Sequence, residues 1–231
     1  MQSQTRHGER DEYRDADHLY VQGTDPVDTG LVSSLSRPNA NLTGVHLFTV
    51  LLSAKRQELL HELVPSAAAV AMLVNPSNVQ NQFELPDVEA AAAKIGQPVH
   101  ILTASTDGEI DAAFATIVEQ RIGGLFVQGD VFLTSRRERL VLLTTRHAIP
   151  TLFAWREFVT AGGLMSYGAD LRAAYRLSGI YAAQILKGAK PAELPVQQAT
   201  KVELVINLRA AKVLGIDVPP TLLARADEVI E

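Results

Sequence analysis

The sequence predicts an α/β protein of two lobes, in which parallel sheets are flanked by helices and the first lobe is incomplete. Two observations favour this fold class. Short, wholly apolar runs recur about 25–30 residues apart in the middle of the chain, which is the spacing of βαβ units. Amphipathic segments with helix-start and helix-stop residues lie between these runs. Apolar runs without alternation are typical of parallel strands that helices cover on both faces.

Four apolar runs are the expected strands of the central lobe. They are Ala69–Val74, Val99–Leu102, Leu125–Val127 and Pro150–Phe153. Because helical segments separate them, we expect residues 51–158 to form one complete α/β lobe around a four-stranded parallel sheet.

The helices between these strands are marked by their ends. Lys55–Leu63 places three leucines on one stripe, and the alanine-rich segment Asp87–Ile95 stops at a glycine. Two residue pairs have the spacing of a capping box: Thr106 with Glu109, and Ser135 with Glu138. Each pair predicts the start of a further helix.

The segments on either side of the central lobe contain the pieces of another one. Before it we expect a strand at 19–22, a helix at 27–35 and extended chain at 42–48; after it, strands at 164–167 and 202–206 and helices at 170–187, 208–214 and from 219 onward. We therefore expect residues 19–50 and 159–231 to form one discontinuous lobe, with crossovers near 42–52 and 154–163. This lobe has few candidate strands, so its half-sheet could pair with that of a second copy in a homodimer.

The first 18 residues are almost all polar or charged. We expect residues 1–18 to be a disordered tail, because such a segment cannot bury itself in a core. No apolar stretch follows its basic residues, so it does not resemble a signal peptide. A chain that starts at this methionine would stay in the cytoplasm.

The composition excludes several classes of protein. The chain has 231 residues, of which 47% are hydrophobic and 20% are charged, as in soluble globular proteins. Its net charge of -5 argues against a nucleic-acid partner, and it has no cysteine for disulfides or thiolate chemistry. No motif for a nucleophile, a metal or a nucleotide is present, so we predict no catalytic residue, no metal site and no cofactor.

Candidate ligand-binding residues lie where strands end, which is where open parallel sheets bind ligands. The candidates in the central lobe are Asn75, Ser77, Asn78, Asp130, Trp155 and Glu157, and those in the flanking segments are Asp25, Thr43, Tyr167 and Asp170. This mixture of carboxylates, amides and an aromatic ring suits a small zwitterion better than a phosphate. Each position also has a structural alternative, as a turn, a helix cap or a packing residue at a hinge.

Several blocks of sequence resemble one family. The blocks include AMLVNPSN, HAIPTLFAWREFVTAGGLMSYG and KGAKPAELPVQQATKVELVINLRAAKVLGI, and the resemblance covers about residues 20–231. They resemble the substrate-binding proteins of bacterial ABC transporters of the tryptophan/tyrosine-uptake type, which have a type I periplasmic-binding-protein fold. The resemblance implies a small-molecule ligand, such as an amino acid, in an interlobe cleft, delivery to a membrane permease, a periplasmic location and no catalysis.

This resemblance suggests a role for each candidate of the central lobe. Asn75, Ser77 and Asn78 would contact the ligand's carboxylate beside a helix N-terminus. Either Asp130 or Glu157 would pair with its ammonium group. Trp155 would stack on an aromatic or apolar side chain.

The chain departs from this family at its start. Family members begin with a signal peptide and further βα units of the first lobe, for which we find no counterpart. We therefore expect a truncated copy with weak or no binding. One alternative is a cytoplasmic small-molecule sensor of the LacI type, although residues 1–18 contain no helix-turn-helix. Another is a non-functional remnant of a binding protein.

Overall fold

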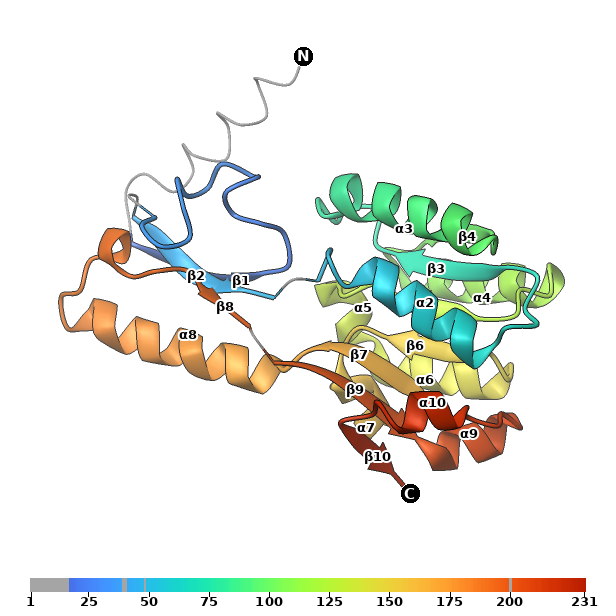
Figure 1. Ribbon diagram of the computed structural model, residues 1–231. Coiled ribbons are helices and arrows are strands. Elements are labelled where there is room, and N and C mark those ends of the chain that lie inside the picture. Colours follow the sequence, from blue (N-terminus) through green and yellow to red (C-terminus); the bar gives the residue numbers. More distant parts are fainter. Residues whose placement is uncertain (1–16, 39–40, 48, 200) are drawn as a thin grey trace, which may run out of the picture. The chain divides into compact units, whose positions relative to one another are not determined.

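A computed structural model describes residues 17–38, 41–47, 49–199 and 201–231 (Figure 1). The chain forms two compact units. Unit 1 comprises the described residues up to Thr49 and Ala169–Lys201, and unit 2 comprises Val50–Gly168 and Val202–Glu231. The chain therefore passes from one unit to the other after residues 49, 168 and 201. Most of the predicted tail at 1–18 lies outside the described residues, and His18 is the first residue of a strand.

Unit 2 is built on a sheet of seven strands in the order β10-β9-β7-β6-β5-β3-β4 (Figure 1). Their bounds are β3 Val70–Val74, β4 Val99–Thr103, β5 Leu125–Val127, β6 Thr151–Phe153, β7 Met165–Ala169, β9 Val202–Asn207 and β10 Glu228–Ile230. Strands β3 to β6 pair in parallel, as the apolar runs predict. Hydrogen bonds from Asn207 N to Leu164 O (2.8 Å) and from Asp170 N to Lys201 O (3.2 Å) join opposite ends of β7 and β9, so these two strands are antiparallel.

The boundary of the central unit differs from the expected one. Residues 159–168 and 202–231, which the sequence assigns to the outer lobe, lie in unit 2. Their apolar side chains explain the difference, because Met165, Ile206 and Leu222 are fully buried in the same core as Leu60 and Met72. The sheet thus has three strands beyond the predicted four.

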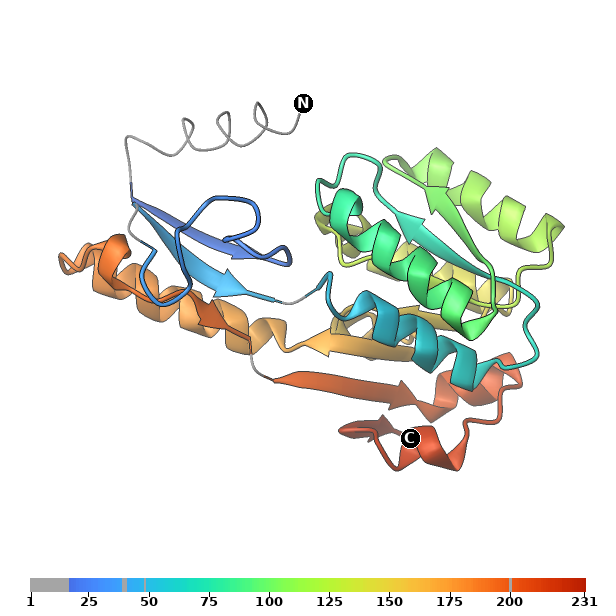
Figure 2. The ribbon, with the colours of Figure 1, turned by 45° about the horizontal axis from the view of Figure 1, so that its top comes forward.

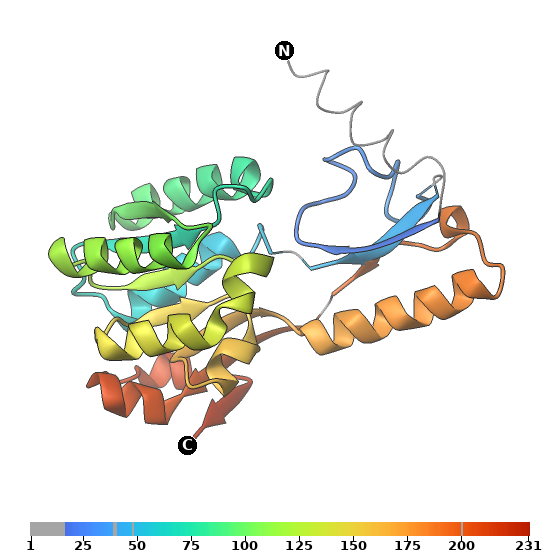
Figure 3. The same cartoon turned by 180° about the vertical axis from the view of Figure 1, so that it is seen from behind.

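Helices cover both faces of this sheet. Their bounds are α2 Ser53–Leu63, α3 Asn81–Ile95, α4 Asp107–Glu119, α5 Val131–Ser135, α6 Arg137–Arg146, α7 Arg156–Thr160, α9 Leu208–Leu214 and α10 Pro220–Leu223. Helices α2 and α3 pack side by side on one face (Figure 2), and α4 and α6 lie on the opposite face (Figure 3). The segment 154–163, expected to be a crossover, contains α7 instead, and the chain leaves unit 2 only after Gly168.

One of the two predicted capping boxes forms. The Thr106 hydroxyl accepts a hydrogen bond from Glu109 N (3.2 Å), and the Glu109 carboxylate accepts one from Ser105 N (2.6 Å), so the start of α4 is capped. The prediction for Ser135 is wrong. This residue ends α5, and its hydroxyl donates to Phe132 O (2.6 Å) rather than capping α6.

Unit 1 has a smaller sheet of parallel strands in the order β1-β2-β8. The strands are β1 His18–Gln22, β2 Leu42–His46 and β8 Gln197–Gln198. The helix α8, Leu171–Leu186, packs along β1 and β2 (Figure 2), and a short 3₁₀ helix spans Pro191–Glu193. The small core of unit 1 is formed by Val32, Leu42 and Val196.

The prediction of a helix at 27–35 is wrong, because that segment forms a series of turns. The Asp25 carboxylate accepts from Val27 N (2.8 Å) and begins one turn. Gly30 ends it with a φ of +75°, in the left-handed region that a helix cannot continue through. The Ser33 hydroxyl then donates to Arg37 O (3.1 Å), a local bond that competes with helix formation.

Candidate ligand-binding site

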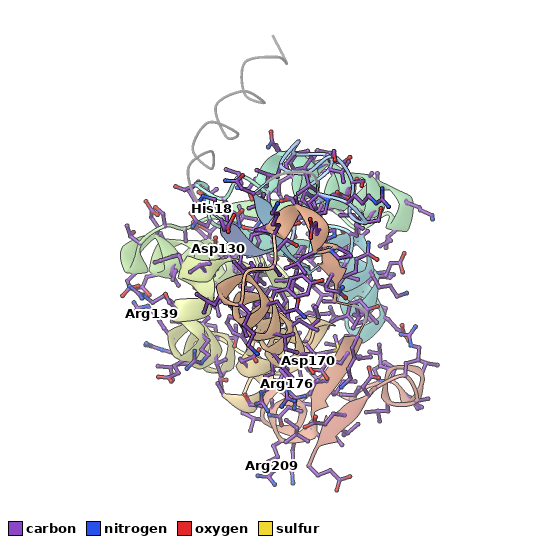
Figure 4. The ribbon with its side chains drawn as sticks, turned by 90° about the vertical axis from the view of Figure 1, so that its left-hand side faces the viewer. His18, Asp130, Arg139, Asp170, Arg176 and Arg209 are labelled. Carbon is purple, nitrogen blue, oxygen red and sulfur yellow. The ribbon has the colours of Figure 1, made fainter. Side chains whose placement is uncertain are left out.

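The candidate residues of unit 2 gather at one edge of its sheet. Because β3, β5 and β6 are parallel neighbours, their carboxyl ends meet at the same edge. Asn75 follows β3, Asp130 lies three residues beyond the end of β5 (Figure 4), and Trp155 lies two residues beyond the end of β6. We call this region the carboxyl edge.

The Asp130 carboxylate bonds to two other candidate residues, Asn75 and Asn78. It accepts from Asn75 Nδ2, which lies 3.2 Å from both carboxylate oxygens, and from Asn78 Nδ2 (3.1 Å). It also accepts from Leu133 N (3.1 Å), which makes it the N-cap of α5. Asp130 is only 9% exposed, and its carboxylate already accepts hydrogen bonds from two side-chain amides and from the first turn of α5.

Asn75 holds the turn that follows β3. Its Oδ1 accepts from Ser77 N (3.0 Å), its carbonyl oxygen accepts from Asn81 Nδ2 (2.8 Å), and its backbone N–H donates to Gln128 Oε1 (3.2 Å). We call residues 75–78 the Asn75 turn. Ser77 is exposed on this turn, and Asn78 is half-buried.

Trp155 and Glu157 lie at the end of β6 and the start of α7. Trp155 is 5% exposed, so it packs into the unit and only a small part of its surface can contact a ligand. Glu157 Oε2 is buried and has no hydrogen-bond donor among the residues that the structure describes. The neighbouring Arg156 bonds to Glu203 (3.1 Å) and Glu228 (2.8 Å) and ties α7 to β9 and β10.

The candidates outside this edge make local structural contacts. In unit 1, the Asp170 carboxylate caps α8 by accepting from Arg172 N (3.0 Å) and Ala173 N (3.1 Å). Thr43 is fully buried, and its hydroxyl donates to Leu194 O (2.8 Å). Asp25 likewise accepts from the turn that follows it. In unit 2, Tyr167 contributes its carbonyl oxygen, which accepts from Arg56 Nε (2.8 Å).

Beneath the carboxyl edge lies a buried ionic group that the sequence does not predict. Arg56 and Glu84 have side chains that are 0% exposed, with Nη1 and Oε1 4.0 Å apart. The Ser53 hydroxyl bonds to both of them. Glu84 Oε2 accepts from Gln128 Nε2 (2.6 Å), which also donates to Asn81 Oδ1 (2.7 Å). The group therefore connects to the Asn75 turn through Gln128.

Burial affects both charges of this pair. Burial raises the pKa of Glu84 above its ordinary value, and the charge of Arg56 and the hydrogen bonds from Ser53 and Gln128 oppose the rise. Burial lowers the pKa of Arg56 to about 10, against the charge of Glu84, and leaves the guanidinium charged at neutral pH. The geometry is that of an ion pair whose remaining polar atoms need hydrogen-bond partners.

Helical spacing could have revealed both residues. Arg56 precedes Leu59, Leu60 and Leu63 by three, four and seven positions, so it lies in the apolar stripe of α2. Glu84 likewise shares the buried face of α3 with Val88 and Ala92. A charged residue within an apolar stripe indicates a buried, partnered charge.

Unit 2 also contains a hollow of about 420 Å³ at the carboxyl end of β9. Its lining includes Val159, Asn207, Val213 and Ile230, and none of the predicted site residues. Within the described part of the chain, no three His, Asp or Glu residues are grouped so that they could hold a metal ion. No helix in the same residues is long and apolar enough to cross a membrane.

Two solved structures match nearly the whole chain. The ABC domain in complex with L-Trp from Streptococcus pneumonia matches with a TM-score of 0.81 at 26% identity, over 97% of this chain and 77% of that one. A ligand-free, open substrate-binding protein with adhesive properties from Clostridium difficile matches with a TM-score of 0.64 at 25% identity, over 94% and 72% of the two chains. The fold is therefore that of the type I periplasmic-binding proteins, as predicted.

The chain belongs to the family of ABC transporter substrate-binding proteins, whose family model matches residues 19–230. The tyrosine-binding protein of Clostridioides difficile (strain R20291) is 28% identical over 191 residues, which are 83% of this chain and 54% of that protein. The chain thus spans about half the length of the curated relative that it matches. The resemblance seen in the sequence is confirmed.

Proposed function

We propose that this chain is the solute-binding component of an ABC importer and that it binds an aromatic amino acid at the carboxyl edge of unit 2. The observation that carries the proposal is the Glu157 carboxylate, which has a buried oxygen without a hydrogen-bond donor among the described residues. A buried acceptor left unsatisfied is costly, and a ligand's ammonium group would supply a charge-assisted bond to it. The relatives named for tyrosine and crystallised with L-Trp support this ligand class.

The carboxyl edge offers complementary groups for the ammonium and carboxylate groups of an amino acid. Glu157 would take the ammonium group, because the Asp130 carboxylate is already engaged by Asn75 and Asn78. The exposed Ser77 hydroxyl and the amide of the half-buried Asn78 would take the carboxylate, beside the start of α3. The ends of β6 and β3 are separated by β5, so these groups lie about 10 Å apart. The ammonium and carboxylate groups of an amino acid are bonded to the same carbon atom, and a hydrogen bond of about 3 Å on each side would let them reach both groups.

We further propose that the loaded protein presents its ligand to a membrane permease on the outer side of the cytoplasmic membrane. Membership of the substrate-binding family supports this role.

Isothermal titration calorimetry with L-tryptophan and L-tyrosine tests the ligand. Both should bind saturably and raise the melting temperature, in contrast to the weak or absent binding expected from the sequence, because all the proposed contacts lie within unit 2. Indole-3-propionate lacks the amino group and should bind about tenfold more weakly or worse, since a bond between charged groups contributes about 1.5–3 kcal/mol. Glu157→Gln should weaken the amino acids by the same factor, whereas Glu119→Gln, an exposed carboxylate at the end of α4, should not. The absence of binding by both amino acids would overturn the proposed ligand.

A further inference from the structure

Gln128 connects the buried Arg56–Glu84 pair to the Asn75 turn. Its Nε2 donates to Glu84 Oε2 (2.6 Å) and to Asn81 Oδ1 (2.7 Å). Because both neighbours of this nitrogen are acceptors, the amide oxygen must point the other way. There it accepts from Asn75 N (3.2 Å). The Gln128 amide group therefore links the buried Glu84 to the Asn75 turn at the edge of the sheet, and its orientation is fixed by both.

The two oxygens of Glu84 set this orientation. Oε1 accepts a hydrogen bond from the Ser53 hydroxyl and Oε2 accepts one from Gln128, so the face of Gln128 that meets Glu84 must be the NH₂ group. Arg56 and Ser53 contact the other carboxylate oxygen. Arg56 is itself anchored through Nε to Tyr167 O (2.8 Å), so the carboxylate is held between two helices and the middle of β7.

We propose that Glu84 and Arg56 are positioning residues for ligand binding, which act through Gln128 to fix the Asn75 turn. This inference rests on the proposed function, because the turn presents Ser77 and Asn78 to the ligand. Every polar group of Asn75 is bonded within the protein, so Asn75 orients the turn and leaves the ligand contacts to its neighbours. A turn that is already in its bound geometry loses less entropy when the ligand binds.

Glu84→Gln keeps the shape of the side chain but replaces one acceptor oxygen by an NH₂ group, which can only donate. If the new amide oxygen faces Gln128, its NH₂ group faces the Arg56 guanidinium, and two donors meet. If instead its NH₂ group faces Gln128, that residue must turn over and place its own NH₂ group against Asn75 N. Either arrangement leaves donors opposed within a buried network, which is costly and loosens the turn.

Two measurements on the same variants test the inference. The first is the ¹H–¹⁵N spectrum without ligand, in which Glu84→Gln should shift the Asn75 backbone amide and the Gln128 side-chain amide. The second is calorimetry with L-tryptophan and L-tyrosine, in which the variant should bind about tenfold more weakly, the effect of losing one well-made hydrogen bond. The matched control is Glu203→Gln, a second buried carboxylate, which accepts a hydrogen bond from Arg156.

The outcomes separate this inference from the proposed function. Failure of the unaltered chain to bind either amino acid overturns the proposed ligand, while the spectra still decide whether Glu84 orients Asn75. Unchanged amide positions in Glu84→Gln, or an equal loss of affinity in Glu203→Gln, would overturn the positioning role. Should Glu84→Gln not fold, Gln128→Met removes the connecting amide, and wild-type affinity in that variant would refute the proposal.

Discussion

Replacing Gly168 by alanine tests the close approach of β6 and β7 at the point where the chain leaves unit 2. A Cβ atom at this position would lie 2.0 Å from Ala154 O and 3.5 Å from Arg56 Nη2. Because real contacts of a Cβ atom are not shorter than 3.0 Å, the end of β7 would have to move by about 1 Å. The obstructing atom belongs to the backbone, so no side-chain rotation relieves the clash.

The magnitude follows from two contributions. Overpacking of this kind costs about 1–3 kcal/mol. A shift of β7 also stretches the hydrogen bond from Arg56 Nε to Tyr167 O, and bonds from charged groups contribute about 1.5–3 kcal/mol. We expect a loss of about 3 kcal/mol, which lowers the melting temperature by about 6–12 °C for a chain of this size.

Urea and thermal unfolding followed by Trp155 fluorescence measure this loss, since the ring is buried in the same unit. The matched control is Gly108→Ala in α4, where a Cβ atom meets nothing within 4 Å. That variant should gain about 0.4–1 kcal/mol, because alanine restricts the unfolded chain and favours helix. An unchanged midpoint for Gly168→Ala, or equal shifts for both variants, would refute this reasoning.

Three further predictions concern single contacts. Arg156→Ala removes the guanidinium that faces the buried Glu203 and should lower the free energy of unfolding in urea by about 3 kcal/mol. Arg139→Ala, whose pair with Asp111 is exposed (Arg139 is labelled in Figure 4), should lower it by less than about 1 kcal/mol, and equal losses would contradict this. Thr106→Ala should cost about 1 kcal/mol by removing the cap of α4, and Ser135→Ala, which caps no helix, should cost clearly less. Burial lowers the pKa of His46 below its ordinary 6.5, against the charges of Asp25 and Asp28, so the folded state binds fewer protons than the unfolded state and stability falls as the pH drops below 6.5. Melting temperatures measured across that range should depend less on pH in His46→Gln, and identical pH profiles would contradict the assignment.

The sequence predicts the elements whose signal is local. Strand β5 has the predicted bounds, because a short apolar run between helices can only be buried on both faces. The start of α4 follows from the spacing of Thr106 and Glu109, since a capping box is made by neighbours in the chain. The apolar pattern at 27–35 predicts a helix, but the left-handed conformation of Gly30 interrupts it, and the segment forms turns.

Long-range pairing could not be read in the same way. Strand β9 has the same apolar pattern whichever sheet it joins, and only packing against Leu164 and Met165 places it in unit 2. The choice between Asp130 and Glu157 as partner for an ammonium group was also open in the sequence. It depends on Asn75 and Asn78, whose amides reach Asp130 only in the folded chain.

The central claim is that an amino acid binds at the carboxyl edge of unit 2. Titration of the ¹⁵N-labelled chain with L-tyrosine tests it most directly, because each backbone amide reports its own surroundings. We predict saturable shifts concentrated at Ser77, Asn78 and Glu157. Saturable shifts confined to the hollow lined by Val159 and Asn207, or no saturable shift at any residue, would contradict the claim.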